Sequence, residues 1–160
     1  SILEFMNITL DMVTSREVMT QWVRHRIASH AIRSQRYVME YGDDGVHFIR
    51  PQFSVKKGED TADDLAGMYR TWEEACRASE SYYKEMLLHG AKKDDARKVL
   101  NNSVATRMIT CINARELRHI LNLRLSAAAY PEMRRLAQLI LKEVSVIPVL
   151  FDDFIEKERR

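Results

Sequence analysis

Arginine and histidine side chains are concentrated in two separate segments of this sequence, and these are the residues best suited to chemistry on an anion. Between residues 16 and 37 there are five arginines and a single glutamate, and between residues 91 and 135 ten Lys or Arg residues face four acidic ones. Guanidinium groups bind phosphate and carboxylate oxygens through paired, charge-assisted hydrogen bonds. The formal net charge of the whole chain is only +2, so we expect any anion binding to be local.

The second cationic segment has the pattern of an amphipathic helix that begins at Asn113. On a helical wheel Arg115 and His119 share one face, and the leucine and isoleucine side chains of 117–121 share the opposite face. Arg124 falls on the apolar side, where a charged group is costly unless it is paired or reaches a polar cavity. Arg124 is therefore a candidate site residue, and a buried ion pair or an extension to solvent are the alternatives.

The first cationic segment contains Arg24, His25 and Arg26 in succession. The periodicity predicts a helix from Arg16 to about Ser29, on which these three side chains point in different directions. One interpretation is that they bind different anionic parts of a ligand or contact another subunit. The alternative is a solvated helix surface with one hydrogen-bonded histidine.

Composition excludes several classes of protein. Two cysteines without a CxxC pair argue against a disulfide scaffold and against zinc, so no metal site is expected. Five glycines without a GxGxxG or P-loop motif exclude a glycine-rich phosphate cradle. The near-neutral charge and the lack of an aromatic series argue against nucleic-acid binding. No apolar run is long enough for a membrane span, so we expect no membrane association and a soluble, cytoplasmic protein.

The order of predicted elements favours an α+β fold in one domain over residues 1–160. Strands are predicted at 4–13, 36–41, 46–49 and 104–112. Helices are predicted at 16–29, 61–88, 93–100, from 113, at 131–146 and from 148. The apolar stripe of the long helix at 61–88 is expected to lie in the core.

Residues 24–37 resemble the RHRxxSxxxxSxRY signature of the flavin-dependent thymidylate synthases, the ThyX family. The preceding Gln21-Trp22 and the later run from Asn113 to His119, followed by Leu123-Arg124, also stand in that family's order and spacing. The resemblance extends over essentially the whole chain. The sequence is similar to a phage-like or N-terminally shortened member of the family.

The resemblance implies a ThyX-like antiparallel sheet packed with long helices. It also implies a homotetramer with active sites between subunits, in which dUMP is converted to dTMP with FAD, NADPH as reductant and methylenetetrahydrofolate as carbon donor. The implied FAD-binding residues are Arg24, His25, Arg26, Ile27, Asn113, Arg115 and His119. The implied nucleotide-binding residues are Gln21, Arg33, Ser34, Gln35, Arg36, Arg97 and Arg124, of which Arg124 is the catalytic residue at the uracil ring.

The sequence departs from the family pattern at Ala31 and Ile32, where the family usually has an Asn-Glu pair, and at 129–134. These departures leave two alternatives open: a relative that makes a modified nucleotide such as 5-hydroxymethyl-dUMP, or a non-catalytic nucleotide-binding or assembly protein.

Overall fold

The computed structural model describes residues 2–37, 41–42, 45–53 and 62–158. The chain folds as two compact units. Unit 1 comprises residues 1–14, 18–32 and 107–160, and unit 2 comprises residues 15–17 and 33–106. Each unit is described by itself below. The mixture of helices with an antiparallel sheet confirms the predicted α+β class.

A three-stranded sheet in the order β1-β5-β2 lies at the centre of unit 1. Its strands are β1 (Asn7–Ser15), β5 (Ala105–Asn113) and β2 (Ala28–Ile32). The 3-10 turn η1 (Ile2–Glu4) precedes β1. Burial alternates along β5, as expected for a sheet with one face against the core. On its exposed face the Arg107 Nε donates to Asp11 Oδ1 at 2.8 Å, which links β5 to β1.

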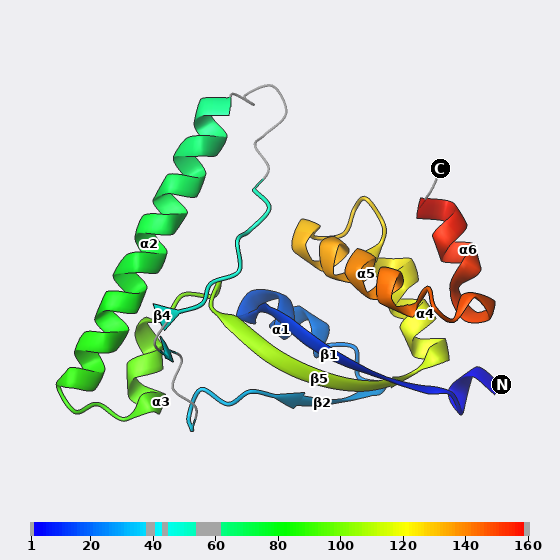
Figure 1. Cartoon of the computed structure of the whole chain (residues 1–160), viewed down its shortest axis with the longest axis horizontal. Helices are drawn as coiled ribbons and strands as arrows, with labels where there is room; N and C mark the ends of the chain where they lie inside the picture. Colours follow the sequence, from blue (N-terminus) through cyan, green and yellow to red (C-terminus); the bar gives the residue numbers. More distant parts are fainter. Residues whose placement is uncertain (1, 38–40, 43–44, 54–61, 159–160) are drawn as a thin grey trace. The chain divides into compact units, whose positions relative to one another are not determined.

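Helices cover the other face of this sheet (Figure 1). They are α1 (Arg16–Trp22), α4 (Ala114–Arg124), α5 (Pro131–Val144) and α6 (Pro148–Glu158). Their apolar side chains join those of the strands in one core cluster, which includes the fully buried Trp22, Met108 and Leu117. The predicted starts of α5 at Pro131 and α6 at Pro148 are confirmed.

Unit 2 is built on the long helix α2 (Ala62–Leu88). Around it lie the two-residue strands β3 (Tyr41–Gly42) and β4 (Gly45–Val46), the short helix α3 (Lys93–Ala96) and the 3-10 turn η2 (Arg97–Val99). Helix α2 ends where predicted, before Gly90, whose φ of 84° is a left-handed conformation that suits glycine.

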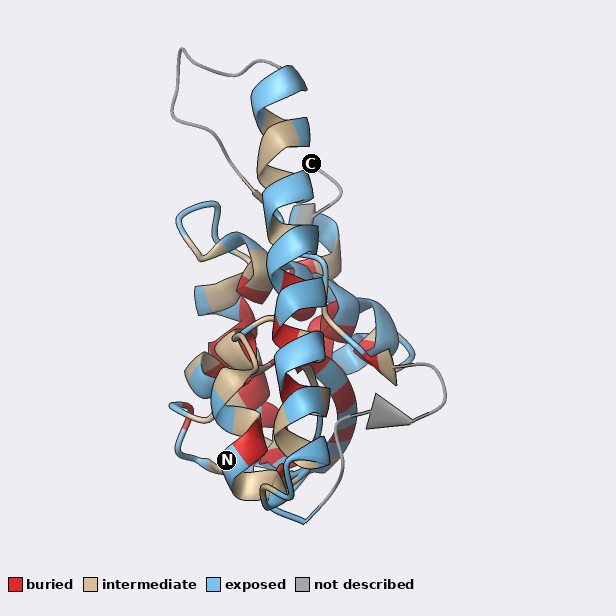
Figure 2. Ribbon diagram, turned by 90° about the vertical axis from the view of Figure 1, so that its left-hand side faces the viewer, coloured by how far each residue is buried: buried red, intermediate tan, exposed pale blue. Residues whose placement is uncertain are grey.

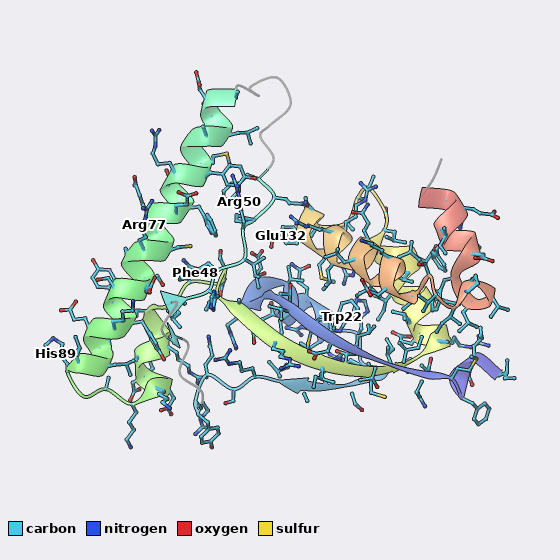
Figure 3. All side chains as sticks on the ribbon, viewed as in Figure 1. Trp22, Phe48, Arg50, Arg77, His89 and Glu132 are labelled. Atoms are coloured by element: carbon cyan, nitrogen blue, oxygen red, sulfur yellow. The ribbon has the colours of Figure 1, made fainter. Side chains whose placement is uncertain are left out.

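The core of unit 2 is small, and the predicted core stripe of α2 is only partly buried. Cys76, Ser79 and Tyr83 are buried, but Tyr82 is 57% exposed and Ala75 lies at the surface. Figure 2 shows exposed residues along most of this helix. Phe53 and Arg50 both pack against Tyr69 near the start of α2, separately from this core. In Figure 3, the labelled Arg77 and His89 lie on or just beyond this helix.

Two expectations for the first half of the chain are wrong. The helix predicted for 16–29 ends at Trp22, and Ala28–Ile32 forms strand β2 instead. The strand predicted at 36–41 is a turn at Arg36 and Tyr37, followed by residues 38–40 outside the described part and by β3. Among the described residues, no helix combines the length and the apolar character needed to cross a lipid bilayer.

Candidate functional site

Arg24, His25 and Arg26 lie in the loop between α1 and β2, not on a helix. The backbone tightens at this point, since the amides of Arg24 and His25 donate to carbonyls three residues back, at Gln21 and Trp22. Residues 28–32 then pair with residues 108–112 of β5. This long-range pairing outweighs the local periodicity from which a helix over 16–29 was predicted.

The Arg24, His25 and Arg26 side chains of this loop differ in their exposure to solvent. Arg24 and Arg26 are exposed, and within the described part of the chain no hydrogen bond or ion pair engages either guanidinium. Ile27 is 66% exposed, whereas only 8% of His25 is accessible. The loop therefore buries one imidazole and leaves two guanidinium groups available to an external anion.

His25 contacts Arg124, the last residue of α4 and 99 positions away in the chain. The Arg124 Nε donates to His25 Nε2 across 3.2 Å. Because Nε2 accepts a hydrogen bond, the His25 proton must lie on Nδ1. Two residues from the two distant cationic segments are thus brought together inside unit 1.

The surroundings of His25 keep its imidazole neutral. Burial is the main cause that lowers its pKa from 6.5 to about 4, and electrostatic interactions with Arg124, His119 and His30 act in the same direction. The edge of the ring also packs against Trp22, with ring centroids 5.8 Å apart. At neutral pH His25 is therefore an acceptor toward Arg124 and a donor through Nδ1.

Helix α4 positions Asn113, Arg115 and His119 at its start and along its surface. The Asn113 side chain caps the helix, because its Oδ1 accepts from the Glu116 amide at 2.8 Å. The opposite face is buried, as the predicted wheel requires. Arg115 forms an ion pair with Glu4 at 2.9 Å, and His119 is exposed.

Four of the predicted phosphate-binding residues lie in unit 2. Arg36 and Arg97 meet at Asp94: Arg36 Nε is 3.8 Å from Asp94 Oδ2, and Arg97 Nε donates to the Asp94 carbonyl at 3.3 Å. The amide of Arg36 donates to Ser34 Oγ at 3.3 Å. The ion pair is long and exposed, so it holds Arg36 only weakly. A phosphate with a better geometry could displace it.

Gln35 adds an unusual feature to this part of unit 2. Its side chain is 5% exposed, and its Nε2 has no hydrogen-bond partner among the described residues. A buried amide donor without an acceptor is costly, and such groups often face a ligand. Of the remaining predicted nucleotide-binding residues, Gln21 in the last turn of α1 lies in unit 1 together with Arg124, and the exposed Arg33 lies in unit 2.

Sequence reasoning missed Asp94, which contacts both arginines, and the polar residues beneath His25, namely His30 and Thr110. The short run Lys92–Asp95 carried no signal beyond its mixed charge. His30 lies where the sequence predicts a loop or a helix end, so its pairing with β5 was not visible. The departures Ala31 and Ile32 lie on β2, and both are exposed.

Comparisons with known proteins agree on one family. The family described as thymidylate synthase complementing protein matches residues 1–149. A flavin-dependent thymidylate synthase of Pyrococcus furiosus is 36% identical over 148 residues, which is 91% of this chain and 57% of that protein. Those of Geobacter sulfurreducens and Sulfolobus acidocaldarius are 35% and 36% identical over 96% and 86% of this chain, or 63% and 49% of theirs. The chain thus spans less than two thirds of the length of these curated relatives.

Proposed function

This chain belongs to the thymidylate synthase complementing protein family, and on that premise we propose that it catalyses the flavin-dependent reductive methylation of dUMP to dTMP. The observation that carries the proposal is the hydrogen bond between His25 and Arg124. It joins the two cationic segments on which the resemblance depends, at side chains assigned to the flavin and to the uracil ring.

The residues of unit 1 suit a flavin dinucleotide. Its pyrophosphate requires cations, and Arg24 and Arg26 are exposed without partners in the described part of the chain. The Nδ1–H of neutral His25, His119 and the Asn113 amide group supply further polar contacts to the cofactor. Arg115 would give up its exposed ion pair with Glu4 to bind the cofactor, and Ile27 would supply apolar surface. A bound flavin supplies reducing equivalents for the one-carbon unit.

Arg124 is the proposed catalytic residue at the pyrimidine. Its Nε is used by His25, which leaves the two terminal nitrogens of the guanidinium to donate to the uracil carbonyl oxygens. A guanidinium held in a fixed orientation stabilises negative charge that develops on those oxygens during ring activation. His25 orients Arg124 without adding a competing positive charge, since the imidazole is neutral.

The nucleotide phosphate is assigned to Ser34, Gln35, Arg36 and Arg97, with Gln21 and Arg33 as further contacts. The unpaired Gln35 amide would gain an acceptor, and Arg36 would exchange the long contact with Asp94 for a charge-assisted bond to the dianion. Methylenetetrahydrofolate as carbon donor and NADPH as reductant complete the proposed reaction. We further propose a single domain over 1–160 in a cytoplasmic homotetramer with active sites between subunits.

Ala31 and Ile32 favour a second candidate, in which the chain binds the nucleotide without methylating it or makes a modified product such as 5-hydroxymethyl-dUMP. Ala31 stands where the family usually has the amide of an asparagine, and Ile32 stands where it usually has the carboxylate of a glutamate. This alternative retains the flavin and phosphate contacts and changes only the reaction outcome.

One experiment separates these candidates. Purified protein is saturated with FAD, and binding is followed by the visible flavin absorbance. The protein is then incubated with NADPH, methylenetetrahydrofolate and dUMP labelled with tritium at C5 of the uracil ring. Tritium release together with dTMP identified by mass spectrometry is the expected result. A heavier nucleotide carrying a hydroxymethyl group would support the modified product. Flavin binding without tritium release would support the non-catalytic role, and a protein that takes up no FAD would contradict the proposal.

A further inference from the structure

A chain of hydrogen bonds runs beneath the loop that carries Arg24, His25 and Arg26. His30 on β2 lies directly opposite Thr110 on β5 in the antiparallel register. The His30 Nδ1 is 2.9 Å from Thr110 Oγ1, and its Nε2 is 3.2 Å from the His25 carbonyl oxygen. Trp22, labelled in Figure 3, places its Nε1 at 3.1 Å from the same Thr110 hydroxyl. Three elements, α1, β2 and β5, thus meet at one hydroxyl group.

The chemistry of these groups gives the chain a direction. The indole Nε1 is only a donor, so Thr110 Oγ1 accepts from Trp22. The hydroxyl then donates its own proton to His30 Nδ1, and His30 carries its proton on Nε2, from which it donates to the His25 carbonyl. Every donor finds an acceptor in this arrangement, which requires His30 to carry a single ring proton, on Nε2.

The same chain reaches His25 from the backbone side. The His25 carbonyl accepts from His30, its amide donates to the Trp22 carbonyl, and its ring accepts from Arg124. Backbone and ring are therefore held independently. In the described residues the side chains of the adjacent Arg24 and Arg26 have no hydrogen bond or ion pair, so their placement depends on the residue between them.

The burial of Thr110 indicates that its hydroxyl group has a role beyond packing in the core. It is 0% exposed, and its neighbours on the same face of β5 are the apolar Met108 and Ile112. A hydroxyl at such a position costs stability unless it is hydrogen-bonded, and a valine would fill nearly the same volume. The polar group therefore serves the bonds to Trp22 and His30.

We propose that Thr110 and His30 are positioning residues that fix the orientation of His25, and through it the presentation of Arg24 and Arg26 to the cofactor. The inference rests on the proposed function for the identity of that cofactor. It adds two residues, one on each of two paired strands, to a binding loop that the sequence motif alone describes.

The test begins with the unliganded full chain labelled with nitrogen-15, in which imidazole correlation spectra report the proton position on each histidine. We expect His30 with its proton on Nε2 and His25 with its proton on Nδ1. In Thr110→Val the proton should stay on Nε2, because the bond to the His25 carbonyl remains, and the nitrogen-15 shift of Nδ1 should move to that of an acceptor without a donor; Thr110→Ser should preserve the wild-type shift. His30 found with its proton on Nδ1, or with an Nδ1 shift that is the same in Thr110→Val as in wild type, would overturn the inference.

FAD binding is the second readout, measured by fluorescence titration on the same proteins. Loss of one buried hydrogen bond corresponds to about tenfold weaker binding for Thr110→Val, with Thr110→Ser close to wild type. His30→Gln can still donate to the His25 carbonyl and should bind FAD like wild type. His30→Phe cannot donate and should weaken FAD binding as Thr110→Val does. This pair of His30 variants replaces the Thr110 pair if Thr110→Val does not fold. Equal affinity in all variants would refute the positioning role. A wild type that binds no FAD would instead overturn the proposed function, and the tautomer spectra would still decide on the hydrogen-bonded chain.

Discussion

At the scale of single residues, His25 links the stability of unit 1 to pH. Its pKa is lowered from 6.5 to about 4, mainly by burial and then by electrostatic interactions with Arg124, His119 and His30. Between these two pH values the unfolded chain binds a proton that the folded chain does not, so stability rises with pH across this window and is unaffected by His25 above it. Acidification from pH 6.5 to 4 should remove up to about 3 kcal/mol of the free energy of unfolding.

Urea denaturation at several pH values in this range, at one protein concentration, measures the effect. His25→Gln is the matched control, because its Oε1 can lie near the position of the imidazole Nε2 and accept from Arg124 but does not titrate. Carboxylates that titrate near the lower limit affect both proteins equally, so the difference between the two curves isolates the imidazole. Parallel curves for wild type and variant would show that His25 is not held neutral.

At the scale of elements, the structure separates what periodicity can and cannot predict. Helix α4 was predictable because its apolar face repeats at the helical period and Asn113 provides a cap signal within the same segment. Strand β2 was not, since Ala28–Ile32 is defined by its pairing with β5, some eighty residues later in the chain. Because a helix end was predicted at this segment, the pairing of His30 with Thr110 could not be predicted. Local patterns therefore predicted the α4 part of the site but not the support beneath the loop.

Helix α4 also allows its capping role to be separated from the proposed flavin contact of Asn113. Asn113→Ala removes the acceptor for the Glu116 amide and should lower the free energy of unfolding by about 1 kcal/mol. Asn113→Ser retains the cap and should be nearly as stable as wild type. Denaturant unfolding gives the stability, and FAD titration gives the affinity. Weaker FAD binding in the stable serine variant would assign the amide to the cofactor, whereas wild-type affinity would limit Asn113 to the cap.

At the scale of the whole molecule, the signature motif predicted the family, the order of predicted elements favoured the α+β class, and both are confirmed. It could not predict how the candidate residues divide between compact units. The flavin set, with Arg124, lies in unit 1, and Ser34, Gln35, Arg36 and Arg97 lie in unit 2. Spacing along a motif contains no information on this division, because Ile32 and Arg33 are adjacent in sequence and belong to different units. Each set nevertheless has contacts within its own unit. His25 contacts Arg124 in unit 1, and Arg36 and Arg97 both contact Asp94 in unit 2.

This division predicts that single substitutions affect the two ligands separately. Arg97→Ala removes a phosphate donor from unit 2 and should weaken dUMP binding by about tenfold or more while FAD binding is retained, since a hydrogen bond to a charged group contributes about 1.5 to 3 kcal/mol. His119→Ala in unit 1 should weaken FAD binding and leave dUMP binding to the FAD-saturated protein unchanged. No ion pair of either side chain is present in the described structure, and Arg97→Ala removes only the long hydrogen bond to the Asp94 carbonyl, so both variants should lose little stability, which thermal unfolding checks. Titration of each variant with each ligand gives four affinities. Loss of both ligands in Arg97→Ala would remove that residue from the phosphate site, because a contact confined to the nucleotide cannot reduce the affinity for a cofactor that binds in its absence.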